Sequence, residues 1–175
     1  MRSTVNAAVL SLVIERPSYG GEIGRRFEDR YDGLLASRPQ HVYKALDQLK
    51  LQGLIEPMAI ETDNGSTRDG YRATANGARA YRGWLRTPIP LSKDAPLEIM
   101  IRLASTRPED IDTAEFLLDA YEQAVLATAS RRPVRSKSVI DRALDEERRV
   151  VVGARLRWTA WMRDELRAHT GVREQ

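Results

Sequence analysis

Hydrophobic residues recur at helical spacing in the first part of the chain, on both sides of a break at Pro17. The first stripe comprises Val5, Ala8, Val9, Leu12 and Val13. The second comprises Tyr19, Ile23, Phe27 and Tyr31. Each stripe predicts a helix that buries one face in a core, and Ser18 is the expected N-cap of the second helix, over residues 19–31.

A third helix is predicted from about Arg38 to Gln52. Ser37 supplies an N-cap hydroxyl, Pro39 fits the first turn, and Gly53 is suited to the left-handed conformation that ends many helices. The apolar stripe of this helix comprises Val42, Ala45, Leu46 and Leu49. These buried positions fix the rotation of the helix and leave polar residues on the opposite face.

Two short, partly alternating segments follow the third helix. Residues 54–61 and 70–74 flank a tight-turn signal at Asn64-Gly65 and predict a β-hairpin. Pro57 has no backbone N–H, so we expect it at a sheet edge or at the start of pairing. Thr74 is the expected N-cap of a fourth helix. The inward residues of that helix are Ala78, Tyr81, Trp84 and Leu85.

The C-terminal half is predicted to be entirely helical. Prolines at 88 and 90 break the pattern, which predicts two domains at residues 1–88 and 91–175. Helices are expected over 96–104, over 108–129 and from about 138 to 169. The last helix carries an apolar face about 45 Å long. Its residues are Ile140, Ala143, Leu144, Val151, Ala154, Trp158, Trp161 and Met162. So long a face in a small domain favours a homodimer through the C-terminal helices.

Composition and charge narrow the class of protein. The 175 residues are 42% hydrophobic, which is enough for a core, and the absence of cysteine excludes disulfides and thiolate chemistry. No run approaches the ~20 apolar residues of a membrane span, so we expect a soluble, cytoplasmic protein. The net charge of +3 has its excess in the N-terminal half and permits polyanion binding without identifying it.

No pattern predicts an enzyme, a metal site or a cofactor. His41 and His169 are the only histidines, and their separation suits neither a metal pair nor a catalytic relay. The glycines at 20, 21 and 24 follow no predicted strand, unlike those of a nucleotide-binding loop. No spacing supplies a nucleophile, a base and oxyanion donors together, so we expect a binding protein.

Three helices, a hairpin and a further helix follow the order of a winged helix-turn-helix, whose third helix enters the DNA major groove. The candidate DNA-contacting residues on that helix are Ser37, Arg38, Gln40, His41, Lys44 and Gln48. Arginine and lysine pair with guanine edges and glutamine with adenine. An ordinary solvated face is equally compatible with this stripe, and the order of the elements favours DNA.

Further candidates lie outside that stripe. Asn64, Ser66 and Arg68 in the hairpin suit phosphate or minor-groove contacts, although a polar hairpin tip is the alternative. Tyr43 suits either a phosphate contact or packing between the second and third helices. The basic run 131–137 is assigned to a solvated linker. Three tryptophans are candidate contacts for a flat apolar ligand, with core or dimer packing favoured over ligand binding. They are Trp84, Trp158 and Trp161.

Three motifs resemble those of the PadR family of bacterial regulators. They are SYGGEI at 18–23, VYKALDQLKLQGLI at 42–55 and GYRATANG at 70–77. The resemblance covers residues 7 to about 86 well and the remainder more loosely. It implies an N-terminal winged helix, a C-terminal helical dimerisation domain and, in many members, repression relieved by a small aromatic or drug-like ligand. Lys44 and Lys50 depart from the proline and glutamate that the family often has there.

The sequence therefore predicts a mainly α protein, with a winged helix-turn-helix joined to a helical dimerisation domain. We expect a homodimeric transcriptional repressor on an inverted repeat of double-stranded operator DNA. The alternative is a winged helix that serves only as a protein-interaction module, because a fold does not fix a function. Steeply salt-dependent binding to duplex DNA distinguishes the two.

Overall fold

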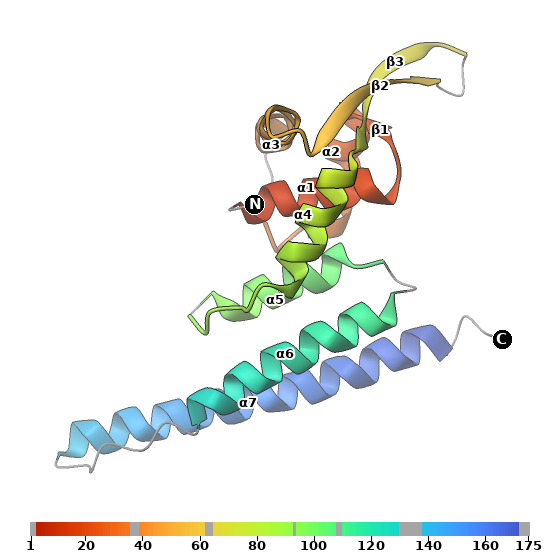
Figure 1. Cartoon of the computed structure of the whole chain (residues 1–175). Helices are drawn as coiled ribbons and strands as arrows, with labels where there is room; N and C mark the ends of the chain where they lie inside the picture. The colour runs from red at the N-terminus through yellow and green to blue at the C-terminus, as the bar shows by residue number, and fades with distance from the viewer. Residues whose placement is uncertain are drawn as a thin grey trace. The chain divides into compact units, whose positions relative to one another are not determined.

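The computed structural model describes residues 3–35, 39–61, 65–92, 94–107, 110–129 and 138–171 (Figure 1). The elements of the N-terminal part are α1 (Thr4–Glu15), β1 (Ser18–Tyr19), α2 (Gly20–Tyr31), α3 (Pro39–Leu51), β2 (Ile55–Glu61), β3 (Thr67–Ala73) and α4 (Ala75–Arg86). They are followed by α5 (Ala95–Ser105), α6 (Ile111–Ala129) and α7 (Val139–Gly171). The prediction of a mainly helical chain with a winged helix and a helical C-terminal part is confirmed.

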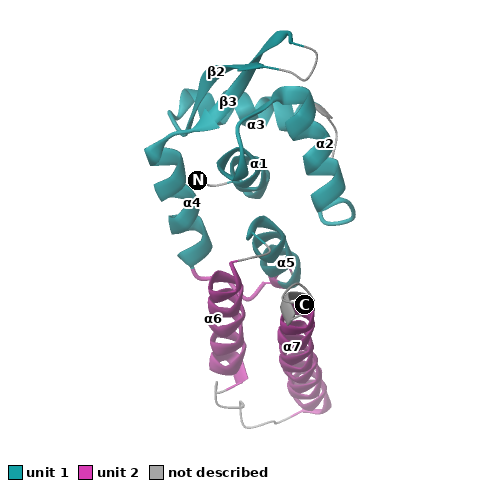
Figure 2. Cartoon of the chain, turned by 90° about the vertical axis from the view of Figure 1, so that its right-hand side faces the viewer, with its two compact units in different colours: residues 1–87, 96–107 teal, residues 88–95, 108–175 magenta. Residues whose placement is uncertain are grey.

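The chain forms two compact units (Figure 2). Unit 1 comprises residues 1–87 and 96–107, and unit 2 comprises residues 88–95 and 108–175. The expected boundary at 88–91 therefore differs from the observed division in one respect, because α5 packs with unit 1. The side chain of Ile101 on α5 enters the core of that unit, which explains the difference.

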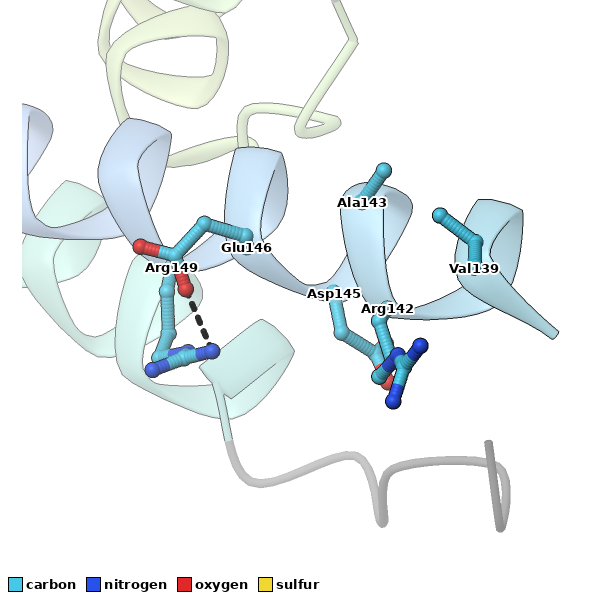
Figure 3. Close-up of a pocket in the computed structure, with 6 residues that line it drawn as sticks. All are labelled: Val139, Arg142, Ala143, Asp145, Glu146 and Arg149. Carbon is cyan, nitrogen blue, oxygen red and sulfur yellow. Dashed lines mark ion pairs between the residues drawn. The ribbon is translucent and has the colours of Figure 1, made fainter. Parts of the chain in front are cut away.

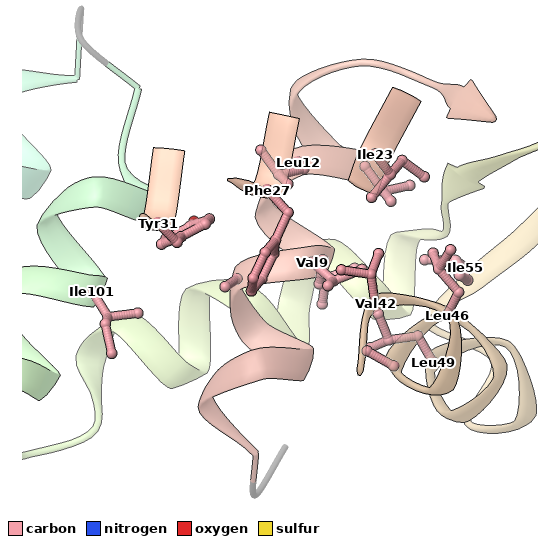
Figure 4. Close-up of a cluster of buried hydrophobic side chains, with 14 residues drawn as sticks. Val9, Leu12, Ile23, Phe27, Tyr31, Val42, Leu46, Leu49, Ile55 and Ile101 are labelled. Atoms are coloured by element: carbon pink, nitrogen blue, oxygen red, sulfur yellow. The ribbon is translucent and has the colours of Figure 1, made fainter. Parts of the chain in front are cut away.

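Helix α1 is the centre of unit 1 and packs against α2, α3 and α4. Residues 6–13 are all buried, so the helix is covered around its circumference and not on one stripe as the spacing predicted. A helix that is apolar on every side belongs in a core. The surrounding cluster includes Phe27 of α2, Leu46 of α3 and Ile55 of β2 (Figure 4).

A buried hydroxyl network ties α5 to this core. The hydroxyl of Tyr31 at the end of α2 lies 2.9 Å from that of Ser11 on α1 and 2.9 Å from that of Ser105 on α5. Burial raises the pKa of Tyr31 and outweighs the opposite effect of both serine hydrogen bonds. The phenol therefore stays protonated, and its hydroxyl group finds its hydrogen-bond partners within the core.

The start of α2 differs from the prediction. Ser18 does not cap the helix: it lies in β1, which pairs with β3, and the N-cap residue Tyr19 makes no side-chain capping bond. The Ser18 hydroxyl is buried and accepts a hydrogen bond from Arg26 at 3.0 Å. A two-residue strand is too short to show the alternation by which strands are recognised in a sequence.

Charged residues connect the end of α1 to α2. A carboxylate oxygen of Glu15 lies 3.0 Å from Arg26 and 2.7 Å from Arg30. Burial by itself raises the pKa of Glu15, but the hydrogen bond and charge of Arg30, with the charge of Arg26, leave that pKa below its ordinary value. Glu15 is therefore ionised at neutral pH and holds both arginines on the side of α2.

The wing is an antiparallel sheet with the order β1-β3-β2. Pro57 lies on the edge strand β2 opposite Tyr71, as its missing N–H required. Gly53 has a φ of +65° and ends α3 as predicted, with the amide of Leu54 donating to the carbonyl of Leu49 at 2.9 Å. The predicted cap of α4 is also confirmed, because the Thr74 hydroxyl accepts from the amide of Gly77 at 3.0 Å.

Unit 2 is built on the pairing of α6 with α7 (Figure 1). The buried face of α6 comprises Ala114, Leu117, Leu118, Tyr121 and Val125. Arg163 of α7 adds an ion pair with Glu122 of α6 at 2.7 Å. The expected linker at 131–137 lies outside the described residues. None of the described helices has both the length and the apolar character required to cross a bilayer.

Candidate nucleic-acid interface

Helix α3 has the rotation that its apolar spacing predicted. Its core stripe is buried and comprises Val42, Ala45, Leu46 and Leu49. The candidate residues on the opposite face are all exposed and comprise Gln40, His41, Lys44 and Gln48. Ser37 and Arg38 lie outside the described residues. The helix therefore presents amide, imidazole and ammonium groups on one side, a set able to bond to base edges and phosphates.

Gln48 also has a partner within the protein. Its side-chain carbonyl accepts a hydrogen bond of 2.9 Å from the amide of Asn6, a buried residue of α1. Glutamine needs both its carbonyl and its amine for a bidentate contact with adenine. Because this carbonyl is already bonded, Gln48 is less suited to adenine recognition than Gln40.

Tyr43 occupies the side of α3 that faces the start of α2. Its side chain is 53% exposed, yet a Cβ atom at Gly20 would lie only 2.9 Å from its Cε1 atom. The ring therefore lies directly against the backbone of Gly20, in the packing position that the sequence left open. A contact with phosphate by the hydroxyl stays a prediction.

The wing supplies one candidate with a defined geometry. The guanidinium carbon of Arg68 lies 5.0 Å from the centroid of the Tyr19 ring, and Arg68 is exposed. Ser66 is exposed as well, and Asn64 lies outside the described residues. The neighbour of Arg68 was not anticipated, because the pairing of β1 with β3 is not visible in the sequence.

Two further residues share the outward face of α3 but were not singled out from the sequence. Asp47 is exposed beside Lys44 and can accept a hydrogen bond from the amine of cytosine. Leu51 is 90% exposed at the end of the helix. Helical periodicity alone places both residues on this face, so the same spacing argument could have identified them from the sequence.

The tryptophans do not form one site within either unit. Trp84 belongs to unit 1. The centroid of its ring lies 6.0 Å from the ring centroid of Tyr81 and 5.2 Å from the guanidinium carbon of Arg102. Trp158 belongs to unit 2 and forms a T-shaped pair with Tyr121, with ring centroids 6.0 Å apart, while Trp161 is 55% exposed. Aromatic packing thus accounts for Trp84 and Trp158, and ligand binding at all three stays a prediction.

A hollow of about 500 Å³ lies along the first turns of α7 (Figure 3). It contains none of the three tryptophans. Among the described residues, the lining side chains all come from this helix; they are Val139, Arg142, Ala143, Asp145, Glu146 and Arg149. Two of the charged residues, Glu146 and Arg149, form an ion pair with each other. The hollow is therefore an open surface groove lined by aliphatic and charged side chains, and not an aromatic-lined cleft of the kind that suits a flat apolar ligand.

Comparison with known proteins gives consistent similarities. Residues 9–83 match the family model described as "Transcriptional regulator PadR-like family". A transcriptional regulator from Clostridium thermocellum is 32% identical over 45% of this chain and 74% of its own, with a TM-score of 0.39. Bacillus subtilis PadR in complex with operator DNA is 20% identical over 96% of this chain and 99% of its own, with a TM-score of 0.45.

The same Bacillus subtilis protein in complex with p-coumaric acid is 18% identical over 93% of both chains, with a TM-score of 0.43. Comparison with curated proteins gave no match. The stretch that matches the family model contains all of α3 and of the wing and ends within α4.

Proposed function

This chain belongs to the PadR-like family of transcriptional regulators, and from that premise we propose that it represses transcription by binding operator DNA as a homodimer. The observation that supports this function is the two-sided character of α3. Its apolar stripe is buried while Gln40, His41 and Lys44 project from the opposite side. A helix of this kind followed by a wing is the arrangement that places side chains in the major groove.

The proposed DNA contacts divide by their chemistry. Gln40, His41 and Lys44, with Arg38 at the start of the helix, contact base edges or phosphates in the major groove. The proposed supporting contacts to phosphates or the minor groove come from Ser37, Tyr43, Gln48, Asn64, Ser66 and Arg68. Lys44 provides the most direct test of the proposed major-groove contacts. In the described part of the chain no acidic side chain forms an ion pair with its ammonium group, so that charge is available to DNA.

Replacing Lys44 with alanine is expected to weaken binding to the duplex upstream of the protein's own gene by about tenfold. The slope of log affinity against log salt should become shallower by about 0.9, the value of one phosphate contact. Fluorescence anisotropy over a series of salt concentrations measures both quantities.

Lys50→Ala is the matched control, because it removes the same charge from the last turn of α3. It should leave the affinity near that of the wild type. Equal affinities for wild type and Lys44→Ala would contradict the role of the α3 face. No binding of the wild type to duplex DNA at any salt concentration would favour a protein-interaction module instead.

The proposed dimer uses the apolar side chains that unit 2 leaves on its surface. On α7 the exposed apolar residues include Val139, Ile140, Leu144, Val150 and Trp161. Phe116 of α6 is also 47% exposed. Solvent contact on so many large apolar groups is unfavourable in a single chain and favours cover by a second copy. Two copies related by a two-fold axis would present two α3 helices to an inverted repeat.

We also propose that a small aromatic ligand releases the protein from DNA, with Trp84, Trp158 and Trp161 as candidate contacts. The observation that supports this assignment is the indole of Trp161, which is 55% exposed. Adding p-coumaric acid should quench tryptophan fluorescence and lower the affinity for the duplex in the same concentration range. Quenching without DNA release, or neither effect, would contradict the proposal for this compound.

A further inference from the structure

Tyr19 and Arg68 meet on one face of the wing. Tyr19 stands opposite Gly70 in the pairing of β1 with β3, and Arg68 lies two residues from Gly70 along β3, on the same face. Diagonal neighbours of this kind in an antiparallel ladder remain within reach of aromatic and long side chains. The distance of 5.0 Å from the guanidinium carbon to the ring centroid places the cation over the ring.

The Tyr19 ring lies beside the start of α2. A Cβ atom at Gly21 would lie 3.5 Å from the Cε2 atom of Tyr19, so the ring occupies the space next to this glycine. At Gly70 a Cβ atom would lie 2.1 Å from the Cδ1 atom of Ile60, so the Ile60 side chain covers Gly70. The half-buried Tyr19 ring therefore lies next to the start of α2 on a closely packed part of the sheet, while Arg68 remains exposed.

The cation–π contact leaves hydrogen-bonding capacity in Arg68. A guanidinium has five N–H donors, and attraction between its charge and the face of an aromatic ring does not occupy all of them. No ion pair joins Arg68 to another residue in the described part of the chain. The side chain thus combines a restricted position with an unneutralised charge and donors for an anionic partner.

We propose that Tyr19 is a positioning residue that strengthens DNA binding through Arg68. This inference rests on the proposed function, because it assigns Arg68 a contact with the DNA phosphates or minor groove. An unrestrained arginine loses rotamer freedom when it binds, and a stacked arginine has already lost part of it. An exposed cation–π contact corresponds to about a two- to fivefold effect on affinity.

A double-mutant cycle tests this assignment. The variants are Tyr19→Leu, Arg68→Gln, their combination, and Tyr19→Phe, which keeps the ring and removes only the hydroxyl. Each is titrated against the upstream duplex by fluorescence anisotropy at several salt concentrations. Arg68→Gln should lower the affinity and reduce the salt slope by about one. Tyr19→Leu should weaken binding by about two- to fivefold. Tyr19→Phe should match the wild type, and the combined variant should bind no more weakly than Arg68→Gln.

Two results would overturn the assignment while leaving the proposed function in place. One is an equal loss from Tyr19→Leu in the wild-type and Arg68→Gln backgrounds. The other is a Tyr19→Phe variant as weak as Tyr19→Leu. Failure of the wild type itself to bind the duplex would instead remove the proposed function, and the inference with it.

A second measurement needs neither DNA nor a folded Tyr19→Leu variant. In the wild-type chain, NMR should detect side-chain protons of Arg68 shifted upfield by the Tyr19 ring current, and Tyr19→Phe should preserve the shift. Wild-type Arg68 protons at the positions of a solvated arginine would overturn the inference, whatever the binding data.

Discussion

Gly77→Ala is expected to destabilise unit 1 by about 2 to 4 kcal/mol, because the added methyl group has no space to occupy. A Cβ atom at Gly77 would lie 2.1 Å from the carbonyl oxygen of Leu54. That oxygen already accepts a hydrogen bond of 3.0 Å from the amide of Thr74. The bond fixes the carbonyl at the point where the residue before β2 meets the N-cap of α4. A backbone carbonyl cannot rotate out of the way as a flexible side chain can. The wing and α4 must therefore move apart at their junction to accommodate the methyl group.

Gly83→Ala provides a control on the same helix with the opposite expected sign. Apart from its chain neighbours and the backbone of its own helix, no atom in the described part of the chain lies within 4 Å of a Cβ at Gly83, and alanine is a better helix former than glycine. This variant should be more stable than the wild type by about 0.5 to 1 kcal/mol. Thermal and urea unfolding followed by circular dichroism measure both changes. Similar midpoints for the two variants would contradict the close packing of α4 on Leu54.

Leu144→Asp is expected to weaken self-association by about 100-fold or more, if α7 forms the dimer interface. Leu144 is 56% exposed in the single chain, so the substitution leaves the core of unit 2 intact. In a two-fold dimer the aspartate occurs twice, and each copy places a carboxylate in an apolar contact at a cost of several kcal/mol. The affinity for an inverted repeat should fall together with self-association, because each monomer then binds only one half-site.

Arg142→Gln is the control for this variant. It changes the net charge by the same amount and lies on the same helix, where Arg142 is exposed beside the hollow of Figure 3. Sedimentation velocity over a concentration series should show a dimer for the control and a monomer for Leu144→Asp. A stable dimer in both variants would place the interface elsewhere.

Helical periodicity predicted the parts of the fold that carry the candidate site. The buried positions of α3 were identified from spacing, and with them the outward direction of Gln40 and Lys44. The ends of α3 and α4 were also predictable, since Gly53 and Thr74 act through local backbone geometry. Such features depend on residues a few positions apart, which is why a single sequence contains them.

Features that depend on distant residues were missed. Nothing near Ser18 indicates that it pairs with Tyr71, and the contact of Tyr19 with Arg68 follows from that pairing. The assignment of α5 to unit 1 likewise depends on Ser105 reaching Tyr31, 74 positions earlier. Proline at 88 and 90 correctly marked the end of α4, but a break in the chain does not tell where the following helix packs.

A footprint on the DNA upstream of the gene tests the central claim most directly. The wild-type protein should protect two half-sites related by an inverted repeat, with centres about 10 to 10.5 base pairs apart or a multiple of that spacing. Lys44→Ala should lose protection at concentrations where Lys50→Ala retains it. Uniform weak protection without paired half-sites, or no protection at any concentration, would contradict the assignment of α3 as a sequence-specific recognition helix.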